Sequence, residues 1–238
     1  MNNKIIVFGG AGKFGRCIIE NLRKQTRDIV NITDTNKEVE FAETIHYEDQ
    51  RALEKIMTKL LSEGYDTIIF AHRAKGGKQN YLEELNRELI PYYATDKAIQ
   101  QIEANNKCLN IVSLNSFAAL KINLDISLSY HVAKAATLQA ARVIGIQNKQ
   151  AKVTSNIVMF GEVMNEDRLT HDATKDSIYE MIKQRTTNNR IATYQSVVNI
   201  VNLLVRRKLP GINREIIQIN EGIERFSFES IIRGGIVQ

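Results

Sequence analysis

The chain has 238 residues, of which 43% are hydrophobic and 25% charged, with 13 Gly, 2 Pro and no Trp. This composition is that of an ordinary globular protein and excludes a fibrous or intrinsically disordered chain. No stretch approaches the ~20 apolar residues that span a bilayer, and the amino terminus lacks the apolar segment of a signal peptide, so we expect no membrane partner. No linker rich in Gly, Ser or Pro divides the sequence, and we therefore expect one domain over residues 1–238.

The net charge of +5 is spread along the chain, which argues against a nucleic-acid partner. The one tight basic cluster, residues 206–208, falls at a predicted helix end, where cations complement the helix dipole. Cys17 and Cys108 fit no metal or redox spacing. We expect both to be buried free thiols, no metal site, and a reducing cytoplasmic location.

Short apolar runs alternate with helical patterns along the chain. The alternation is typical of a doubly wound parallel α/β sheet of about seven strands, with helices on both faces. The last strand, within residues 211–222, has an apolar length that suits an interior position. The predicted strands cover residues 4–8, 28–33, 44–47, 66–71, 108–114, 153–159 and 215–220, and the predicted helices residues 17–22, 51–63, 83–103, 130–146 and 195–207.

A glycine-rich turn, Gly9-Gly10-Ala11-Gly12-Lys13-Phe14-Gly15, follows the first strand and precedes a helix. In this context Gly-x-x-Gly-x-x-Gly lets the backbone turn tightly and approach a pyrophosphate, which the helix N-terminus attracts. The turn predicts a dinucleotide-binding site that includes Gly9, Gly12, Lys13, Phe14 and Gly15.

Asp34 follows the second strand, about 20 residues beyond the turn, where a dinucleotide-binding fold places an acid against the adenosine ribose. A carboxylate there repels a 2′-phosphate, so NAD(H) is favoured over NADP(H), although Lys13 and Arg16, at the start of the first helix, would lie close enough to compensate. A plain turn at Asp34 is the alternative. Asp49, after the third strand, is a candidate for contact with the adenine amine.

The fourth strand ends in a basic loop that includes His72, Arg73 and Lys75. Ligands bind at the carboxyl ends of strands in open parallel sheets. Arg73 and Lys75 therefore predict an anionic substrate, such as a sugar acid, a nucleotide sugar or an acyl carrier thioester. A solvated surface loop explains the same residues equally well.

Tyr130 and Lys134 are four positions apart in a helical stretch, which places a phenol and an ammonium on one face. Such a pair can handle a proton, but the spacing by itself occurs by chance in many helices. A free phenol has a pKa near ~10, so a neighbouring cation must favour the phenolate for proton transfer at neutral pH. The fifth strand, which precedes this helix, ends in Ser116.

Taken in order, the glycine turn, the acid after the second strand, Ser116 and Tyr130-x-x-x-Lys134 resemble the short-chain dehydrogenase/reductase family over almost the whole chain. The resemblance implies hydride transfer between a nicotinamide and a carbonyl or secondary alcohol. It assigns Tyr130 as general acid/base, Lys134 as the cation beside it that also grips the nicotinamide ribose, Ser116 as the hydrogen-bond donor to substrate, and Asn86 as the holder of a relay water. It also places Ala71 and Val163 at the cofactor.

The resemblance further implies a variable substrate loop over residues 164–189, and a homodimer or homotetramer formed through the Tyr130 helix and the C-terminal residues 231–238. Two alternatives remain open. One is a non-catalytic dinucleotide-sensing protein, although such members typically lose the Tyr or the Lys. The other is a nucleotide-sugar epimerase or dehydratase, because the glycine spacing follows that branch, although its members usually have a longer C-terminal region.

Two positions depart from the family pattern. Phe8 replaces the usual Thr before the glycines, and Phe70 stands at the first position of the usual Asn-Asn-Ala-Gly. These positions normally hydrogen-bond across adjacent strands. We expect a concerted exchange of a polar pair for an apolar one.

Overall fold

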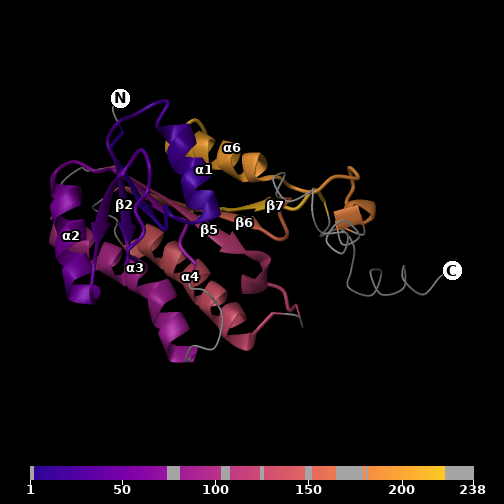
Figure 1. Ribbon diagram of the computed structural model, residues 1–238, viewed down its shortest axis with the longest axis horizontal. Helices are drawn as coiled ribbons and strands as arrows, with labels where there is room; N and C mark the ends of the chain where they lie inside the picture. The colour runs from indigo at the N-terminus through magenta and orange to yellow at the C-terminus, as the bar shows by residue number, and fades with distance from the viewer. Residues whose placement is uncertain are drawn as a thin grey trace.

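A single parallel sheet forms the centre of the protein, seen in a computed structural model that describes residues 3–73, 81–102, 108–123, 126–147, 152–164, 179–180 and 182–222 (Figure 1). Its seven strands run in the order β3-β2-β1-β4-β5-β6-β7, and every neighbouring pair is parallel. The strands are β1 Ile5–Phe8, β2 Ile29–Thr33, β3 Glu43–His46, β4 Thr67–Phe70, β5 Leu109–Ser116, β6 Val153–Phe160 and β7 Ile216–Ile219.

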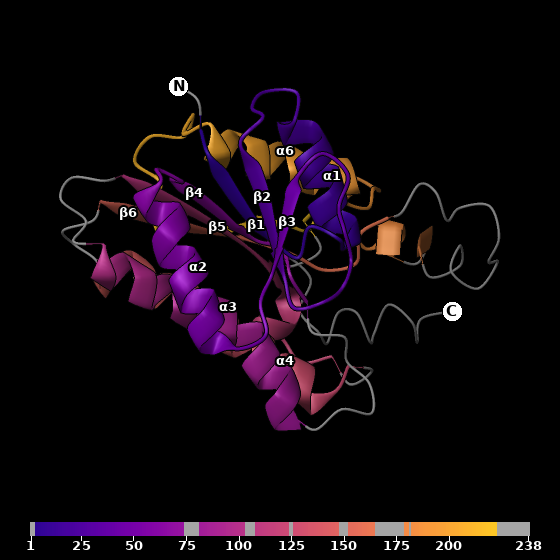
Figure 2. The same ribbon diagram turned by 60° about the vertical axis from the view of Figure 1, so that its left-hand side comes forward.

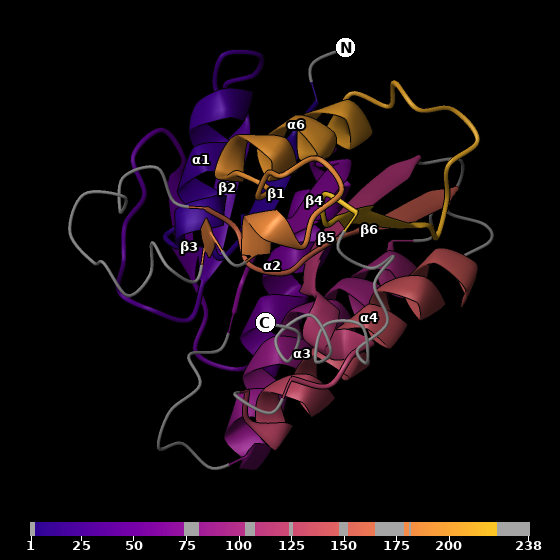
Figure 3. The ribbon, with the colours of Figure 1, turned by 90° about the vertical axis from the view of Figure 1, so that its right-hand side faces the viewer.

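Helices cover both faces of the sheet (Figures 2 and 3). One face carries α1 (Lys13–Leu22) and α6 (Tyr194–Val205), and the other carries α2 (Gln50–Ser62), α3 (Tyr81–Gln101) and α4 (Leu128–Gln147). A short 3₁₀ turn, Phe117–Ala119, follows β5. The doubly wound α/β fold predicted from the sequence is confirmed. Among the described helices, none is long and apolar enough to cross a membrane.

The sheet separates two apolar clusters because successive residues of each strand point to opposite faces. Ile6 and Phe8 of β1 pack toward α2, α3 and α4, whereas Ile5 and Val7 pack toward α1 and α6. Every residue of β1 and β4 is buried, which explains why both read as continuous apolar runs. At about 1.5–3 kcal/mol for each buried large apolar side chain, these clusters are the main source of stability.

The predictions for β7 and for the cysteines need correction. In the described part of the chain β7 lies at the edge of the sheet, not in its interior, and its residues are only partly buried. Its apolar residues reflect contacts with both clusters, in which Ile216 and Ile217 take part. Within the described residues neither cysteine forms a disulfide, but the prediction that both are buried is wrong. Cys17 is only half-buried, and Cys108, directly before β5, is exposed.

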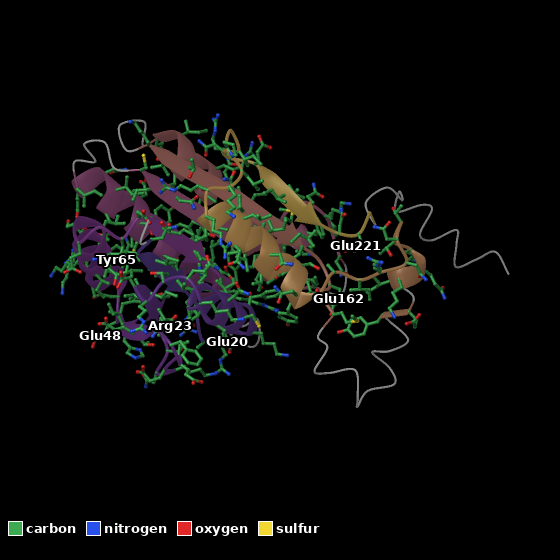
Figure 4. The ribbon with its side chains drawn as sticks, turned by 90° about the horizontal axis from the view of Figure 1, so that it is seen from above. Glu20, Arg23, Glu48, Tyr65, Glu162 and Glu221 are labelled. Carbon is green, nitrogen blue, oxygen red and sulfur yellow. The ribbon has the colours of Figure 1, made fainter. Side chains whose placement is uncertain are left out.

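The strand order places a topological switch point at β1, whose neighbours are β2 on one side and β4 on the other. Connections leave a switch point in opposite directions, which opens a crevice at the carboxyl ends of the strands. Gly9, Asp34, Ala71 and Ser116 all lie at this end. Figure 4 shows Glu162 and Glu221, which follow β6 and β7, on one side of the molecule, with Tyr65, which precedes β4, on the other.

Phe8 and Phe70 lie side by side in register on β1 and β4, and their rings stack at 5.1 Å between centroids. Phe70 also stacks on Tyr92 of α3 at 4.0 Å. All three side chains are buried. The two departures from the family pattern are therefore in direct contact, as a concerted exchange requires.

We expect Phe8→Thr to lower the free energy of unfolding by about 3–5 kcal/mol, because it leaves a cavity and buries a hydroxyl. Phe70→Asn removes a second buried ring and should also be destabilising by itself. The loss in the double variant should be about 1 kcal/mol smaller than the sum of the two single losses, because the two new polar groups can hydrogen-bond to each other. Urea denaturation of the single and double variants measures both values. As a control, Phe8→Thr combined with Leu22→Ala, on the opposite face, should be additive. A double Thr/Asn variant whose loss equals or exceeds the sum of the two single losses would contradict the exchange.

Candidate active site

Two glycines of the turn after β1, Gly9 and Gly15, have no room for a side chain. Gly9 has a left-handed φ of 78°, and a Cβ there would lie 2.5 Å from the Cα of His72. A Cβ at Gly15 would lie 2.3 Å from the carbonyl oxygen of Gly9. The Gly12 N–H donates to that same oxygen at 3.0 Å. Glycine is therefore required where β1, α1 and the end of β4 meet.

The start of α1 is suited to an anion. Its N-cap residue is Gly12, which has no side chain to cap the N–H groups of the first turn. Lys13 is exposed beside it. Phe14 instead packs inward, with its ring centroid 4.6 Å from that of Phe160 and 4.4 Å from that of Tyr194. This glycine cradle and uncapped helix start fit the pyrophosphate of a dinucleotide.

A residue that sequence reasoning missed holds the turn in place. Asn31, fully buried in β2, accepts a hydrogen bond from the Gly10 N–H at 2.8 Å. Gly10 has no room for a side chain because its Cβ would lie 2.5 Å from this same Asn31 oxygen. The available signal was a lone Asn within an otherwise apolar strand.

Asp34 lies directly after β2, with its side chain partly exposed. Its carboxylate is 3.7 Å from the Nε of Arg87, which reaches it from α3. Burial, and then the negative charge of Asp34, raise the pKa of the neighbouring Tyr47, while Arg87 opposes the shift. Asp34, the predicted ribose-binding acid, therefore lies beside the guanidinium of Arg87.

Asp49 has a local structural role. Its side chain caps α2 by accepting the Ala52 N–H at 2.8 Å. Contact between Asp49 and an adenine stays a prediction.

Tyr130 and Lys134 come together on α4, as their spacing predicts. The Lys134 ammonium lies 5.6 Å from the centre of the Tyr130 ring. On the same ring the guanidinium carbon of Arg73, at the end of β4, lies at 4.9 Å. Lys134 is buried, and its Nζ donates to the Glu88 carboxylate at 2.9 Å.

The side chain that reaches Lys134 from α3 is that of Glu88, not that of Asn86. Asn86 lies exposed, two residues earlier on the helix. Two residues turn the side-chain direction by about 200°, so the two positions face opposite ways. The inward face of α3 is marked by residues three or four positions apart, among them Glu84, Glu88, Pro91 and Tyr92. This spacing is visible in the sequence, and the asparagine assignment overlooked it.

His72 completes this buried polar group. Its Nε2 donates to the backbone carbonyl of Glu88 at 2.9 Å, which leaves Nδ1 as the unprotonated nitrogen of a neutral ring. Nδ1 is buried, with no hydrogen-bond partner among the described residues. Burial lowers the pKa of His72 from its ordinary value of 6.5, although the Glu88 charge opposes the shift. The imidazole is therefore neutral at pH 7.

Ser116 ends β5, and its neighbours tie this strand to α4. Asn115 is buried and donates to the carbonyl oxygen of Lys134 at 3.2 Å. His131 Nδ1 donates to the carbonyl of Ala118 at 2.8 Å. The Ser116 hydroxyl itself accepts the Ala118 N–H at 3.2 Å. The residues around Ser116 are thus attached directly to the helix that carries Tyr130.

The other predicted residues occupy the same end of the sheet or fall outside the described ranges. The Ala71 N–H donates to the Phe8 carbonyl at 3.0 Å, and Val163 is buried after β6. Arg73 is exposed at the edge of the site. Lys75, most of the predicted loop over residues 164–189, and residues 231–238 lie outside the described residues.

Comparison with known proteins agrees with this geometry. The sequence profile described as Enoyl-(Acyl carrier protein) reductase matches residues 78–224, more than half of the chain. The chain belongs to the short-chain dehydrogenase/reductase family. Dehydrogenases and reductases of this family are oxidoreductases that act on CH–OH groups. No curated protein matches the sequence.

Solved structures share the fold at low sequence identity. The aldohexose dehydrogenase of Thermoplasma acidophilum is 15% identical, with a TM-score of 0.75 over 95% of this chain and 96% of that chain. A 4-hydroxyisoleucine dehydrogenase complexed with NADH is 17% identical, with a TM-score of 0.76 over 94% of this chain and 100% of the other. A variant of ElxO with NADPH bound is 13% identical, with a TM-score of 0.76 over 95% and 100%.

Proposed function

We propose that the protein transfers a hydride between a nicotinamide dinucleotide and a carbonyl or secondary alcohol, with Tyr130, Lys134 and Ser116 as its catalytic residues. The observation that carries the proposal is the buried Lys134 ammonium at 5.6 Å from the Tyr130 ring, at the end of the sheet where the glycine turn opens. A dinucleotide sensor needs the turn but not the cation beside the phenol. We therefore favour an enzyme over a sensor.

The bound dinucleotide supplies the hydride acceptor or donor. The Tyr130 hydroxyl gives its proton to the carbonyl oxygen of the substrate during reduction and takes a proton from the alcohol during oxidation. The Ser116 hydroxyl donates a hydrogen bond to the same oxygen. Lys134 orients the cofactor ribose and adds positive charge beside the phenol. The relay role of Asn86 stays a prediction, although the α3 side chain in contact with Lys134 is that of Glu88.

The same proposal favours NAD(H), with Asp34 against the adenosine ribose. One of the similar structures is complexed with NADH and another with NADPH. The preference for NAD(H) over NADP(H) therefore rests on Asp34. Gly9, Gly12, Gly15 and the start of α1 hold the pyrophosphate. Lys13 and Phe14 line the turn, and Ala71 and Val163 contribute the nicotinamide side.

We also propose a cytoplasmic homodimer or homotetramer that acts on a small molecule. Tyr93 of α3 and Ile146 of α4 are large apolar side chains exposed on the surface. Contact between two copies of the chain could cover them, which supports an oligomer. An anionic substrate is favoured because the Arg73 guanidinium lies over the Tyr130 ring. The nucleotide-sugar epimerase or dehydratase alternative shares this anionic preference.

Tyr130→Phe should lower kcat/KM by about 10²–10⁴-fold, because it removes the proton donor without disturbing the ring. NADH consumption with a panel of carbonyl compounds measures the loss. Tyr81→Phe, at an exposed tyrosine of α3, is the matched control and should keep full activity. Cofactor binding without turnover across the panel would favour the sensor.

Asp34→Ala should lower the ratio of kcat/KM for NADH to that for NADPH at least tenfold. The substitution removes the repulsion of the 2′-phosphate and leaves the Arg87 guanidinium free to meet it. Asp66→Ala is the control, because Asp66 is similarly exposed but lies before β4, at the opposite end of the sheet. An unchanged ratio would show that Asp34 occupies a plain turn.

Arg73→Ala should raise KM about tenfold for anionic substrates and leave KM for neutral ones unchanged, since a pocket-edge guanidinium contributes mainly charge. Steady-state kinetics with matched charged and neutral carbonyl compounds measures the difference. Arg142→Ala, at an exposed arginine of α4, is the control. No effect of Arg73→Ala on KM for any accepted substrate would exclude the anionic preference.

A further inference from the structure

His131, the residue after Tyr130 on α4, contacts the segment that follows Ser116. Its Nδ1 lies 2.8 Å from the carbonyl oxygen of Ala118. A carbonyl oxygen can only accept a hydrogen bond, so Nδ1 carries the proton of this bond. On the other side of the ring, Nε2 lies 3.3 Å from the amide nitrogen and 3.1 Å from the carbonyl oxygen of Asn123. One side chain of α4 therefore holds both ends of the segment 118–123.

Ser116 lies between two attachments of its strand to α4. Before it, the buried Asn115 donates to the carbonyl oxygen of Lys134 at 3.2 Å and accepts the Ser116 N–H at 2.7 Å. After it, His131 holds the carbonyl oxygen of Ala118. The first attachment fixes the backbone of Ser116. The second one acts on the residue that contacts its hydroxyl.

The Ser116 hydroxyl is oriented by Ala118. The Ala118 N–H donates to the Ser116 Oγ at 3.2 Å. A serine hydroxyl has one hydrogen to donate and two lone pairs that accept. Because the Ala118 N–H occupies a lone pair, the hydrogen remains available for another acceptor, which in the proposed reaction is the oxygen of the substrate. The direction of this donation depends on where Ala118 is held.

We infer that His131 is a positioning residue that, by holding Ala118, fixes the Ser116 hydroxyl relative to Tyr130. The inference rests on the proposed function, in which the hydroxyls of Ser116 and Tyr130 meet the same substrate oxygen. Two groups that bind one oxygen must keep a constant separation, and a displacement of about 1 Å can cost on the order of 10²-fold in rate. His131 and Tyr130 are consecutive on one helix, so the attachment of the turn starts from the residue next to the phenol.

The test compares two replacements of His131 that have the same branched shape. His131→Asn keeps an N–H donor at about the place of Nδ1, whereas His131→Leu has no donor, and both lack the atom that meets Asn123. His131→Leu should have a kcat/KM for carbonyl compounds about tenfold lower than that of His131→Asn, with the KM for the dinucleotide unchanged in both. Leu favours a helix more than Asn does. A role in helix stability alone would therefore rank the two variants in the opposite order.

A double-mutant cycle tests whether His131 acts through Ser116. In a protein that also carries Ser116→Ala no hydroxyl remains to be oriented, so His131→Asn and His131→Leu should have the same kcat/KM. A tenfold difference that persists in this background overturns the inference. Equal kcat/KM of the two variants in the presence of Ser116 overturns it as well.

Amide hydrogen exchange tests the attachment without turnover. The Ala118 N–H should exchange about tenfold faster in His131→Leu than in His131→Asn, because the turn opens more often when the Ala118 carbonyl loses its donor. Equal exchange rates overturn the inference. A protein that shows this difference in exchange but reduces no carbonyl compound would contradict the proposed function and support the attachment of the turn by His131.

Discussion

The buried ammonium of Lys134 is the constraint on which the site depends. It lies on a helix that packs against the sheet, where water cannot stabilise its charge, and the carboxylate of Glu88 meets it at 2.9 Å. This contact joins α3 to α4 beneath the predicted catalytic tyrosine. Without this partner the buried charge would be strongly destabilised, and the orientation of Lys134 that the proposed reaction needs would not be maintained.

The aromatic stack beneath this pair explains how the protein tolerates two departures from its family. Phe8 and Phe70 fill the space between β1 and β4, and Phe70 stacks on Tyr92 of α3. The ring of His72 contacts the edges of these rings, with centroids 6.2 Å from Phe8 and 5.9 Å from Phe70. The stack therefore supports the imidazole that anchors α3 at Glu88. An apolar pair in the strands and a polar cluster at their carboxyl ends form one continuous arrangement.

The order of strands and helices could be predicted because each apolar run is short, continuous and followed by a glycine, an acid or a helical pattern. The glycine turn could be placed for the same reason, since its spacing has few explanations after a buried strand. The edge position of β7 could not be predicted. An apolar run has the same appearance in an interior strand and in an edge strand whose two faces both pack on helices, and only the pairing of strands distinguishes them.

The candidate site, like the fold, could be predicted from the sequence only in part. By itself the sequence determined that a phenol and an ammonium share a face of one helix, and that an acid follows the second strand, because these relations depend on local geometry. Only the tertiary structure decided that Glu88 meets Lys134 and that Asn86 faces away, because the rotation of α3 against α4 depends on how its buried side chains pack. It also brought Arg73 over the Tyr130 ring and Arg87 to Asp34. These pairs are 46 or more positions apart in the sequence, so they come into contact only when the sheet and its helices assemble, and the charge that each residue experiences is determined at that stage.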